Sequence, residues 1–504
     1  MLFRFSLFPV SKAPAARGAF RRLTPLAAAL LFALGGCASL DQRQAGVMAA
    51  ATVAVPDAWS LSAPLAASLA TPLTSTAPSP ALLAAWWRQF GDARLEALID
   101  AALSDAPDAR SAQARLRQAR AMRALAVANL YPSLNVSVGA TRSRSGVEET
   151  QTSYAAGFDA RWEPPVFSGL RDAADAAEAD AAAAQANLES TYASLAAEVA
   201  LEYVSLRGSQ QRQAFVRANV DSQAETLRIT EWREMAGLVT RLDVEQARAN
   251  LEQSRASLPG LEVSRAASEH RLSVLTGQAP GKLREALRET QALPAAPDEI
   301  AVGIPADTLR QRPDVRAAEL ALRAEIARTA QSEAERYPSL TLSGSLDWRA
   351  ASLSALDLAS SLARSLALSL AAPLFDAGRI ESRVAAQQAS QDQAFVAWEK
   401  SLLTALEDVE NALSAYANGR DRVDARRLAA DAAANAAGLA RAQYQAGLVD
   451  FQRVLESERT LLSAQDSLVS AEAEVLTAVI QLYKALGGGW DTTENIASTE
   501  PPRS

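Results

Sequence analysis

The stretch Tyr131-Pro132-Ser133-Leu134 occurs a second time as Tyr337-Pro338-Ser339-Leu340, 206 residues later. Other short matches follow in the same order and at nearly the same spacing: Pro165-Val166-Phe167 with Pro373-Leu374-Phe375, and Gly237-Leu238-Val239 with Gly447-Leu448-Val449. Several matches in one order indicate that the chain runs twice through one structural plan. We expect the first repeat at 86–290 and the second at 291–490, after a leader at 37–85 and before a tail at 491–504.

Long helices are predicted in both repeats. The pattern places them at 92–128, 170–235 and 240–275 in the first repeat, and at 307–335, 379–445 and 450–486 in the second. Alanine, the best helix former, dominates the apolar residues. The segment 170–235 has no proline and one glycine, Gly208, so an unbroken helix there would be about 100 Å long. Apolar residues from Leu188 to Leu206 recur every three or four positions, and such helices must pack against equally long neighbours.

Four short segments have the alternation of β-strands instead, with apolar and polar residues taking turns. They lie near 131–141, 153–166, 337–349 and 361–374, and they pair naturally into two hairpins. Prolines stand where helix and strand meet: Pro132, Pro165, Pro338 and Pro373. Because proline breaks a helix and is tolerated at the first residue of a strand, we interpret these residues as joints.

Strands with one apolar face, one polar face and aromatic residues near their ends are typical of outer-membrane barrels. A half-buried sheet on a soluble core is the alternative. In lipid, the edges of an open four-stranded sheet would leave backbone groups unpaired, so several copies would have to share one closed barrel. The polar residues would then line its lumen: Asn135, Ser137, Asp159, Arg161, Thr341, Ser343 and Asp347. No later stretch reaches the roughly 18 uncharged apolar residues of a transmembrane helix.

The first 36 residues have the features of an export signal: basic residues, an apolar run from Leu23 to Leu34, and small residues before Cys37. The run Leu34-Gly35-Gly36-Cys37 resembles the bacterial lipobox, in which the cysteine becomes the lipid-bearing first residue after cleavage. Cys37 is the only cysteine of the chain, which favours lipidation over an ordinary free thiol. Ala38 stands where aspartate would retain a lipoprotein in the inner membrane, so the outer membrane is favoured.

The composition excludes several classes of function. One cysteine and one histidine, His270, rule out a Cys/His metal centre and a disulfide framework. A net charge of −8 argues against a nucleic-acid partner. Gly487-Gly488-Gly489 follows a helix and not a strand, so it ends that helix and is no phosphate-binding loop. We therefore expect no enzyme activity, no cofactor and no metal.

Taken together, these motifs resemble the TolC family of outer-membrane efflux proteins, in particular the lipoprotein (NodT/OprM-like) branch that serves RND-type multidrug pumps. Arg310-Gln311-Arg312-Pro313-Asp314-Val315 is especially typical of that family. The resemblance implies a homotrimer with a mainly α fold and a β membrane part. Long antiparallel helical hairpins would form a periplasmic α-barrel, and each chain would give four strands to one shared transmembrane β-barrel. The first strand-to-helix joint, with Pro164 and Pro165, departs from the family pattern and puts the start of the next helix in question.

The resemblance also implies function. The protein would be a lipid-anchored duct in the outer membrane, extending into the periplasm and carrying small molecules out for an inner-membrane RND pump. A periplasmic adaptor would dock at tips near 236–243 and 446–456, which carry Gly237, Leu238, Val239, Gly447, Leu448 and Val449. The gate positions of the family correspond to Asp243, Tyr444, Arg453 and Glu456. We expect a contact between Asp243 and Tyr444, whereas Arg453 departs from the usual acidic ring; ordinary pairs on a helix surface are the alternative for these charges.

Three other functions stay open. Within the same class, the duct could serve type I protein secretion or heavy-metal efflux. In a different class, the chain could be a lipid-anchored periplasmic coiled-coil scaffold without a pore. The sequence does not identify the exported compounds, the adaptor or the pump.

Overall fold

The computed structural model describes residues 40–49, 53–60, 80–144, 146, 150–167, 169–297, 305–356 and 361–490. It divides into two units, Met1–Ala50 and Ala51–Ser504. The described part of the first unit is helix α2 (Leu40–Met48), which lies where the sequence predicts an irregular leader. Cys37 and the tail at 491–504 lie outside the described residues. All further description concerns the second unit.

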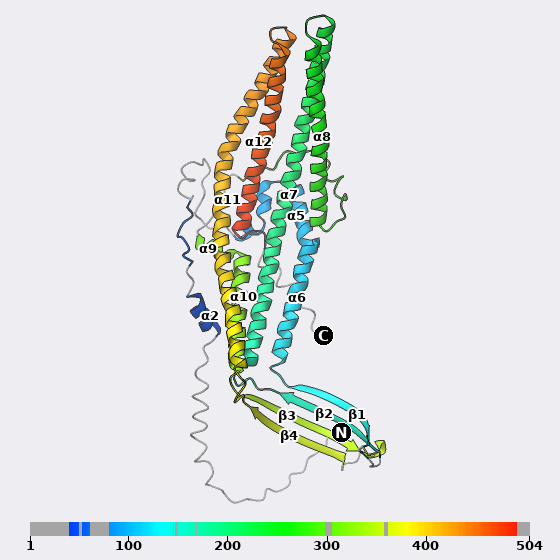
Figure 1. Ribbon diagram of the computed structural model, residues 1–504, viewed down its shortest axis with the longest axis vertical. Helices are drawn as coiled ribbons and strands as arrows, with labels where there is room; N and C mark the ends of the chain where they lie inside the picture. Colours follow the sequence, from blue (N-terminus) through cyan, green and yellow to red (C-terminus); the bar gives the residue numbers. More distant parts are fainter. Residues whose placement is uncertain are drawn as a thin grey trace, which may run out of the picture. The chain divides into compact units, whose positions relative to one another are not determined.

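Two long helical hairpins dominate this unit (Figure 1). The first consists of α7 (Gly169–Met235) and α8 (Arg241–Leu275), and the second of α11 (Arg379–Gln445) and α12 (Phe451–Ala485). The two first helices each have 67 residues and the two second helices each have 35. At 1.5 Å per residue, 67 residues span about 100 Å. The equal lengths express the internal duplication in three dimensions.

Shorter helices pack beside the long ones: α5 (Ala93–Asp105) and α6 (Pro107–Ala128) against α7, α9 (Pro305–Gln311) against α11, and α10 (Pro313–Ala334) between α7 and α11. The sequence predicted single helices over 92–128 and 307–335, and this was wrong. Each is interrupted before a proline, Pro107 or Pro313, that begins the next helix. The preceding residues, Ala106 and Arg312, adopt ψ angles of 137° and 121°, because a following proline disfavours helical geometry.

The main hydrophobic core lies where α5, the 3-10 helix η1 (Trp86–Phe90), α7, α11 and α12 meet. Trp86 is fully buried and stacks on Tyr483, with ring centroids 5.5 Å apart. The apolar stripe predicted on α7 is buried from Leu188 to Leu206, except that Tyr192 is half-buried. In the predicted leader, helix α4 (Pro80–Ala84) adjoins η1. Ser60 attaches the same leader to α11, because its backbone NH and its hydroxyl each donate to the carboxylate of Glu410 at 2.7 Å.

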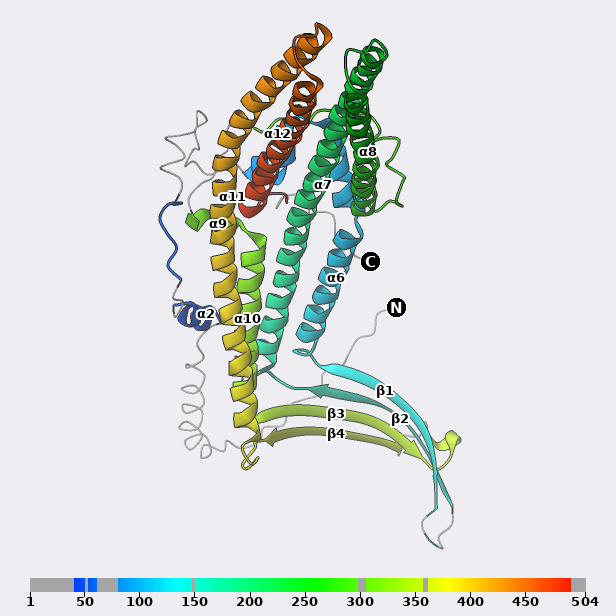
Figure 2. The same ribbon diagram turned by 45° about the horizontal axis from the view of Figure 1, so that its top comes forward.

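The strands form one antiparallel sheet in the order β1-β2-β3-β4: β1 (Ser133–Ser143), β2 (Gln151–Trp162), β3 (Ser339–Ala350) and β4 (Leu362–Ala371). A short 3-10 helix, η2 (Leu353–Ala355), lies between β3 and β4. The two predicted hairpins are joined through β2 and β3, with Phe158 opposite Leu346. The sheet is curved and lies at the opposite end of the long helices from the hairpin turns (Figure 2). This mainly helical architecture with a four-stranded antiparallel sheet confirms the predicted fold class.

Candidate functional site

Both hairpin turns have the same helix-ending geometry. Gly237 and Gly447 adopt φ angles of +70° and +74°, in the left-handed region that glycine enters without strain. The NH of Leu238 donates to the carbonyl oxygen of Arg233 at 2.8 Å, and the NH of Leu448 donates to that of Gln443 at 2.9 Å. With the bonds made by the glycine NH groups, these form two Schellman motifs. Leu238 and Leu448 are exposed, whereas Val239 and Val449 are half-buried.

The helix that follows each turn begins with a side-chain cap. Thr240 and Asp243 form a reciprocal capping box at the start of α8, in which the Asp243 carboxylate accepts from the Thr240 NH at 2.9 Å. Asp450 caps α12 by accepting from the NH of Arg453 at 3.1 Å. Each tip therefore has a glycine-based cap at the end of one helix and a side-chain cap at the start of the next.

The predicted contact between Asp243 and Tyr444 is not formed within the chain. The Asp243 carboxylate is used to cap its own helix. The buried hydroxyl of Tyr444 lies 3.1 Å from Oγ1 of Thr230 on α7. Because Thr230 already donates to the Thr226 carbonyl oxygen, Tyr444 is the donor in this bond. Within the chain, the helical register of α7 against α11, which the sequence does not show, gives Tyr444 the nearer partner Thr230.

A second α7 residue also holds Tyr444. Arg233 donates to the Tyr444 carbonyl oxygen, and its guanidinium carbon lies 4.5 Å from the centre of the Tyr444 ring. The ring further packs against Phe451 at the start of α12. Tyr444 is thus one of the points at which the two hairpins contact each other near their tips.

A polar seam continues from this point between the hairpins. Arg441 of α11 donates to Ser222 Oγ at 2.7 Å, and Thr226 Oγ1 donates to the buried carboxylate of Glu458 on α12 at 3.2 Å. Burial raises the pKa of Glu458 above its usual range, although the Thr226 hydrogen bond and the charge of Arg441 oppose this. Sequence reasoning missed this seam. Its only signal was the four-residue spacing of small polar residues at 222, 226 and 230.

The other two predicted gate residues face solvent. Arg453 Nη1 lies 3.5 Å from a carboxylate oxygen of Glu456, three positions along α12, and both side chains are exposed. This is the helix-surface pair that the sequence left open as an alternative.

The predicted joints lie between helices and strands. Pro132 and Pro338 directly precede β1 and β3, and Pro165 and Pro373 follow β2 and β4. The two helix starts after these joints differ. Helix α7 begins at Gly169, whereas α11 begins after Gly378, at φ +80°, with the Asp376 carboxylate accepting from the Gly378 and Ile380 NH groups at 3.0 and 2.8 Å.

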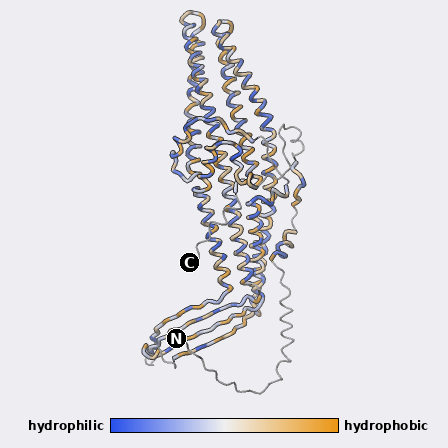
Figure 3. The backbone as a smooth tube through the Cα atoms, turned by 180° about the vertical axis from the view of Figure 1, so that it is seen from behind, coloured by the Kyte–Doolittle hydropathy of each residue, from blue (hydrophilic) through white to orange (hydrophobic). Residues whose placement is uncertain are grey.

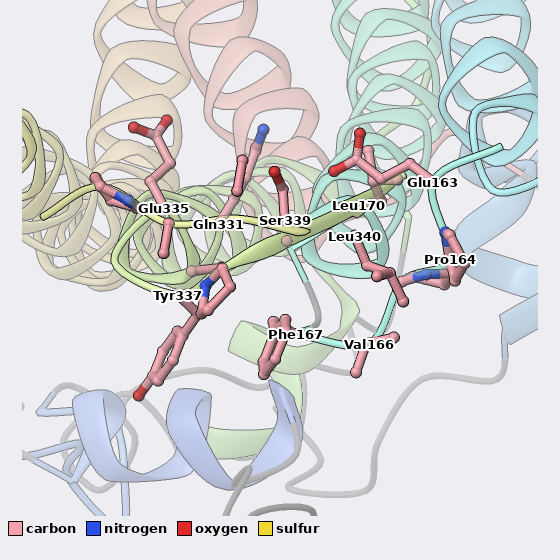
Figure 4. Close-up of a pocket in the computed structure, with 17 residues that line it drawn as sticks. Glu163, Pro164, Val166, Phe167, Leu170, Gln331, Glu335, Tyr337, Ser339 and Leu340 are labelled. Atoms are coloured by element: carbon pink, nitrogen blue, oxygen red, sulfur yellow. The ribbon is translucent and has the colours of Figure 1, made fainter. Parts of the chain in front are cut away.

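The joints of the two repeats meet around a pocket of about 530 Å³ (Figure 4). The rings of Phe167 and Tyr337 stack there, with an interplanar angle of 5° and a centroid distance of 5.9 Å. The Glu163 and Glu335 carboxylates point away from these rings (Figure 4). Glu335 is paired with Arg383 on α11. The pocket therefore has an aromatic side and an acidic side at the base of the sheet.

The sheet register places apolar and polar residues on opposite faces. On one face Val136 lies opposite Phe158, which lies opposite Leu346. The other face carries Asn135 opposite Asp159. The predicted lumen residues all lie on this polar face: Asn135, Ser137, Asp159, Arg161, Thr341, Ser343 and Asp347. The apolar side chains of the two edge strands are exposed: Leu134, Val136, Val138, Leu366, Leu368 and Leu370.

Figure 3 shows hydrophobic and hydrophilic residues alternating along the strands and mixed along the helices. Within the described ranges, no helix is both long enough and apolar enough to cross a membrane. The same residues contain no group of three or more His, Cys, Asp or Glu side chains that could hold a metal ion.

The match to a known protein family has two segments, one in each repeat. The profile of the family described as Outer membrane efflux protein matches residues 98–278 and 304–488. The pyoverdine export outer membrane protein OpmQ of Pseudomonas aeruginosa is 32% identical over 420 residues, which cover 81% of this chain and 88% of that protein. The toluene efflux pump outer membrane protein TtgF of Pseudomonas putida is 29% identical, covering 82% and 86%. The solved outer-membrane channel OprN superposes with a TM-score of 0.80 at 32% identity, covering 87% of this chain and 99% of that one.

Proposed function

The chain belongs to the family of outer membrane efflux proteins, and from this premise we propose that three copies form the exit duct of a tripartite RND-type efflux pump. Such a duct carries small molecules from the periplasm or inner membrane across the outer membrane. One observation carries the proposal most directly: an open four-stranded sheet has an apolar face, a polar face and two unpaired edges.

The edges β1 and β4 support a shared barrel. Lipid cannot pair with their backbone groups, so a membrane-spanning sheet has to close. Three copies of four strands supply twelve, an even number within the range of bacterial barrels. In that barrel Leu134, Val136 and Val138 would contact lipid, and the Asn135 and Asp159 face would line a water-filled lumen.

The helices offer a matching surface between copies. On α11 four exposed apolar residues share one helix face: Val396, Leu403, Leu428 and Leu439. Their spacings of 7, 25 and 11 residues bring each within about 20° of the last at 3.6 residues per turn. A stripe of this kind fits an equally long neighbour, so the helices of three copies would complete a periplasmic α-barrel.

The duct works without chemistry of its own. OpmQ is named for pyoverdine export and TtgF for toluene efflux, which supports small molecules as the cargo class here. The inner-membrane pump supplies the energy, and a periplasmic adaptor joins the pump to the tips at Gly237-Leu238-Val239 and Gly447-Leu448-Val449. Residues 1–36 serve as a signal peptide, and Cys37 carries the lipid anchor.

The seam around Tyr444 keeps the periplasmic end closed. Opening requires the two hairpins to move apart, and this breaks the Thr230 and Arg233 contacts with Tyr444. Arg453 and Glu456, exposed near the same end, would face the entrance and modify which ions pass.

Conductance of the purified protein in planar bilayers tests both the pore and the gate. We expect detergent-extracted trimers, and a higher open-to-closed ratio for Tyr444→Phe. Loss of one neutral hydrogen bond, about 0.5–1.5 kcal/mol, corresponds to a roughly 2- to 12-fold change per chain.

Tyr416→Phe is the matched control, because this buried α11 tyrosine belongs to the main core far along the helix from the tip. Asp243→Ala separates a gating role of Asp243 from helix capping. If Tyr444→Phe leaves the closed-state conductance unchanged, Tyr444 is not part of the gate. A monomer that forms no pores would instead support the coiled-coil scaffold.

A further inference from the structure

The two hairpin tips differ in chemistry although they share one backbone geometry. We propose that the α7–α8 tip is the main contact for the adaptor and binds an apolar helical-hairpin end, while the α11–α12 tip contributes little. This inference rests on the proposed function, because it assigns the partner to one of the two proposed docking tips.

The first tip exposes four large apolar side chains within eleven residues. Trp232 and Met235 in the last turns of α7 are 55% and 73% exposed, Leu238 in the turn is 67% exposed, and Leu242 at the start of α8 is 64% exposed. In a Schellman motif the residue after the glycine commonly packs toward the position that Trp232 occupies here. The guanidinium of Arg228 lies 5.2 Å from the Trp232 ring centre and covers part of the ring.

The second tip has mostly small or polar residues at the same positions. The 210-residue repeat matches Trp232 with Ala442, Met235 with Gln445 and Leu242 with Gln452. Only Leu448, 76% exposed, keeps the apolar character of its counterpart. Gln452 is already hydrogen-bonded to Gln246 on α8. An apolar partner therefore finds a patch of four side chains on one tip and a single leucine on the other.

The patch does not belong to the contacts inside the chain. Thr230 faces Tyr444 and is fully buried. Trp232, two positions later, lies about 200° further round a helix with 100° per residue and points away from that contact. Exposed tryptophan is the residue type most enriched at energetic centres of interfaces.

Several charged side chains beside the patch are paired within the chain. Arg248 pairs with Glu231 and Glu245, each at 3.2 Å. Arg228 pairs with Glu225, and Arg233 is engaged with Tyr444. Because these charges are already paired, a partner that covers the tip gains binding free energy mainly from burial of the large apolar side chains.

The position of the patch selects the kind of partner. Copies that share one tube lie side by side and leave the ends of their hairpins uncovered. The turn between α7 and α8, which includes Leu238, forms such an end (Figure 1). A partner that meets this end with a helix turn of its own can place apolar residues against Leu238 and Trp232. Each tip is small, so three tips acting together would supply the affinity through effective concentration.

The experiment uses the lipidated trimer and a full-length periplasmic adaptor of an RND pump from the same bacterium, with binding measured on a sensor surface. The first-tip variant Trp232→Ala/Leu238→Ser should weaken binding at least about 10-fold. The matched second-tip variant Ala442→Ser/Leu448→Ser should weaken it less than about 3-fold. Ala442→Trp/Gln445→Met copies the patch onto the second tip. Added to the first-tip variant, these substitutions should restore at least half of the lost binding affinity, measured on a logarithmic scale.

Each other result overturns the inference in a distinguishable way. Equal losses at both tips would mean that the docking is symmetric, and the proposed function would survive. Trimers that dissociate in the first-tip variant would mean that a neighbouring copy covers the patch. Failure of the unmodified trimer to bind the adaptor would overturn both this inference and the adaptor assignment.

Discussion

Replacing Arg312 with alanine should loosen the junction where α10 begins beside α11 and the end of α12. The Arg312 side chain is 8% exposed. Its Nε and Nη2 atoms donate to the two oxygens of Asp314 at 3.0 and 2.6 Å. Nη2 also donates to Asp408 on α11 at 2.9 Å, and Nη1 donates to the carbonyl oxygen of Ala485 at 3.1 Å. One guanidinium thus connects three helices.

The size of the stability loss depends on which groups Arg312→Ala leaves unpaired. Removing one partner of a buried ion pair costs about 3–5 kcal/mol, because a charge stays behind without compensation. Here the carboxylates of Asp314 and Asp408 are 44% and 46% exposed, so water can rehydrate them. The carbonyl oxygen of Ala485 loses its side-chain donor as well. We therefore expect Arg312→Ala to lower the free energy of unfolding by about 2–3 kcal/mol.

Thermal unfolding in detergent, followed by circular dichroism, measures this loss. Arg310→Ala is the matched control, because Arg310 lies two residues away in the same motif and its side chain is exposed; its effect should stay within about 0.5 kcal/mol. Arg312→Lys keeps the charge but cannot bridge all three partners. Its loss in free energy of unfolding should therefore lie between those of Arg312→Ala and Arg310→Ala. Equal melting temperatures for Arg312→Ala and Arg310→Ala would refute the reasoning.

The pH dependence of stability tests the same ion pair in a second way. Burial opposes ionisation of Asp314, but the hydrogen bonds and the charge of Arg312 hold its pKa below the usual range. A carboxyl whose folded pKa is lowered stabilises the protein above its unfolded pKa of about 3.9 and loses that contribution as pH falls through the folded value. The difference in stability between wild type and Arg312→Ala should therefore shrink below about pH 4.

Two further predictions concern the tip region. Burial raises the pKa of Glu458, so ionisation of this carboxyl opposes folding above its unfolded pKa. Glu458→Gln should therefore raise the melting temperature at pH 7–8, and the gain should disappear below about pH 4.3. The control Glu456→Gln, at an exposed position, should leave the melting temperature unchanged. A gain that persisted in acid would exclude ionisation as its cause. Gly237→Ala should lower the free energy of unfolding by about 1 kcal/mol because φ is +70°. Gly438→Ala, inside α11 with open space around it, should raise the free energy of unfolding by about 0.4–1 kcal/mol. Hydrogen exchange at the ends of α7 and α11 measures both changes, and a change in the same direction for both variants would contradict the conformational argument.

The sequence by itself determined the long elements of this protein. Helix α7 runs from Gly169 to Met235 because nothing in that segment breaks a helix except one tolerated glycine. The two faces of the sheet follow from the two-residue period of strands, which fixes on which side Val136 and Asn135 lie. The duplication was visible because the same short motifs mark the same structural transitions in both halves.

Only the tertiary structure decided which distant residues meet. Within the chain, Tyr444 contacts Thr230, 214 positions away, because the partner depends on the axial offset and the rotation of the two long helices against each other. The 3.6-residue period identifies the buried face of each helix but not that offset. The burial of Glu458 and the pairing of β2 with β3 depend on packing in the same way, since both arise between the two repeats and not within either one.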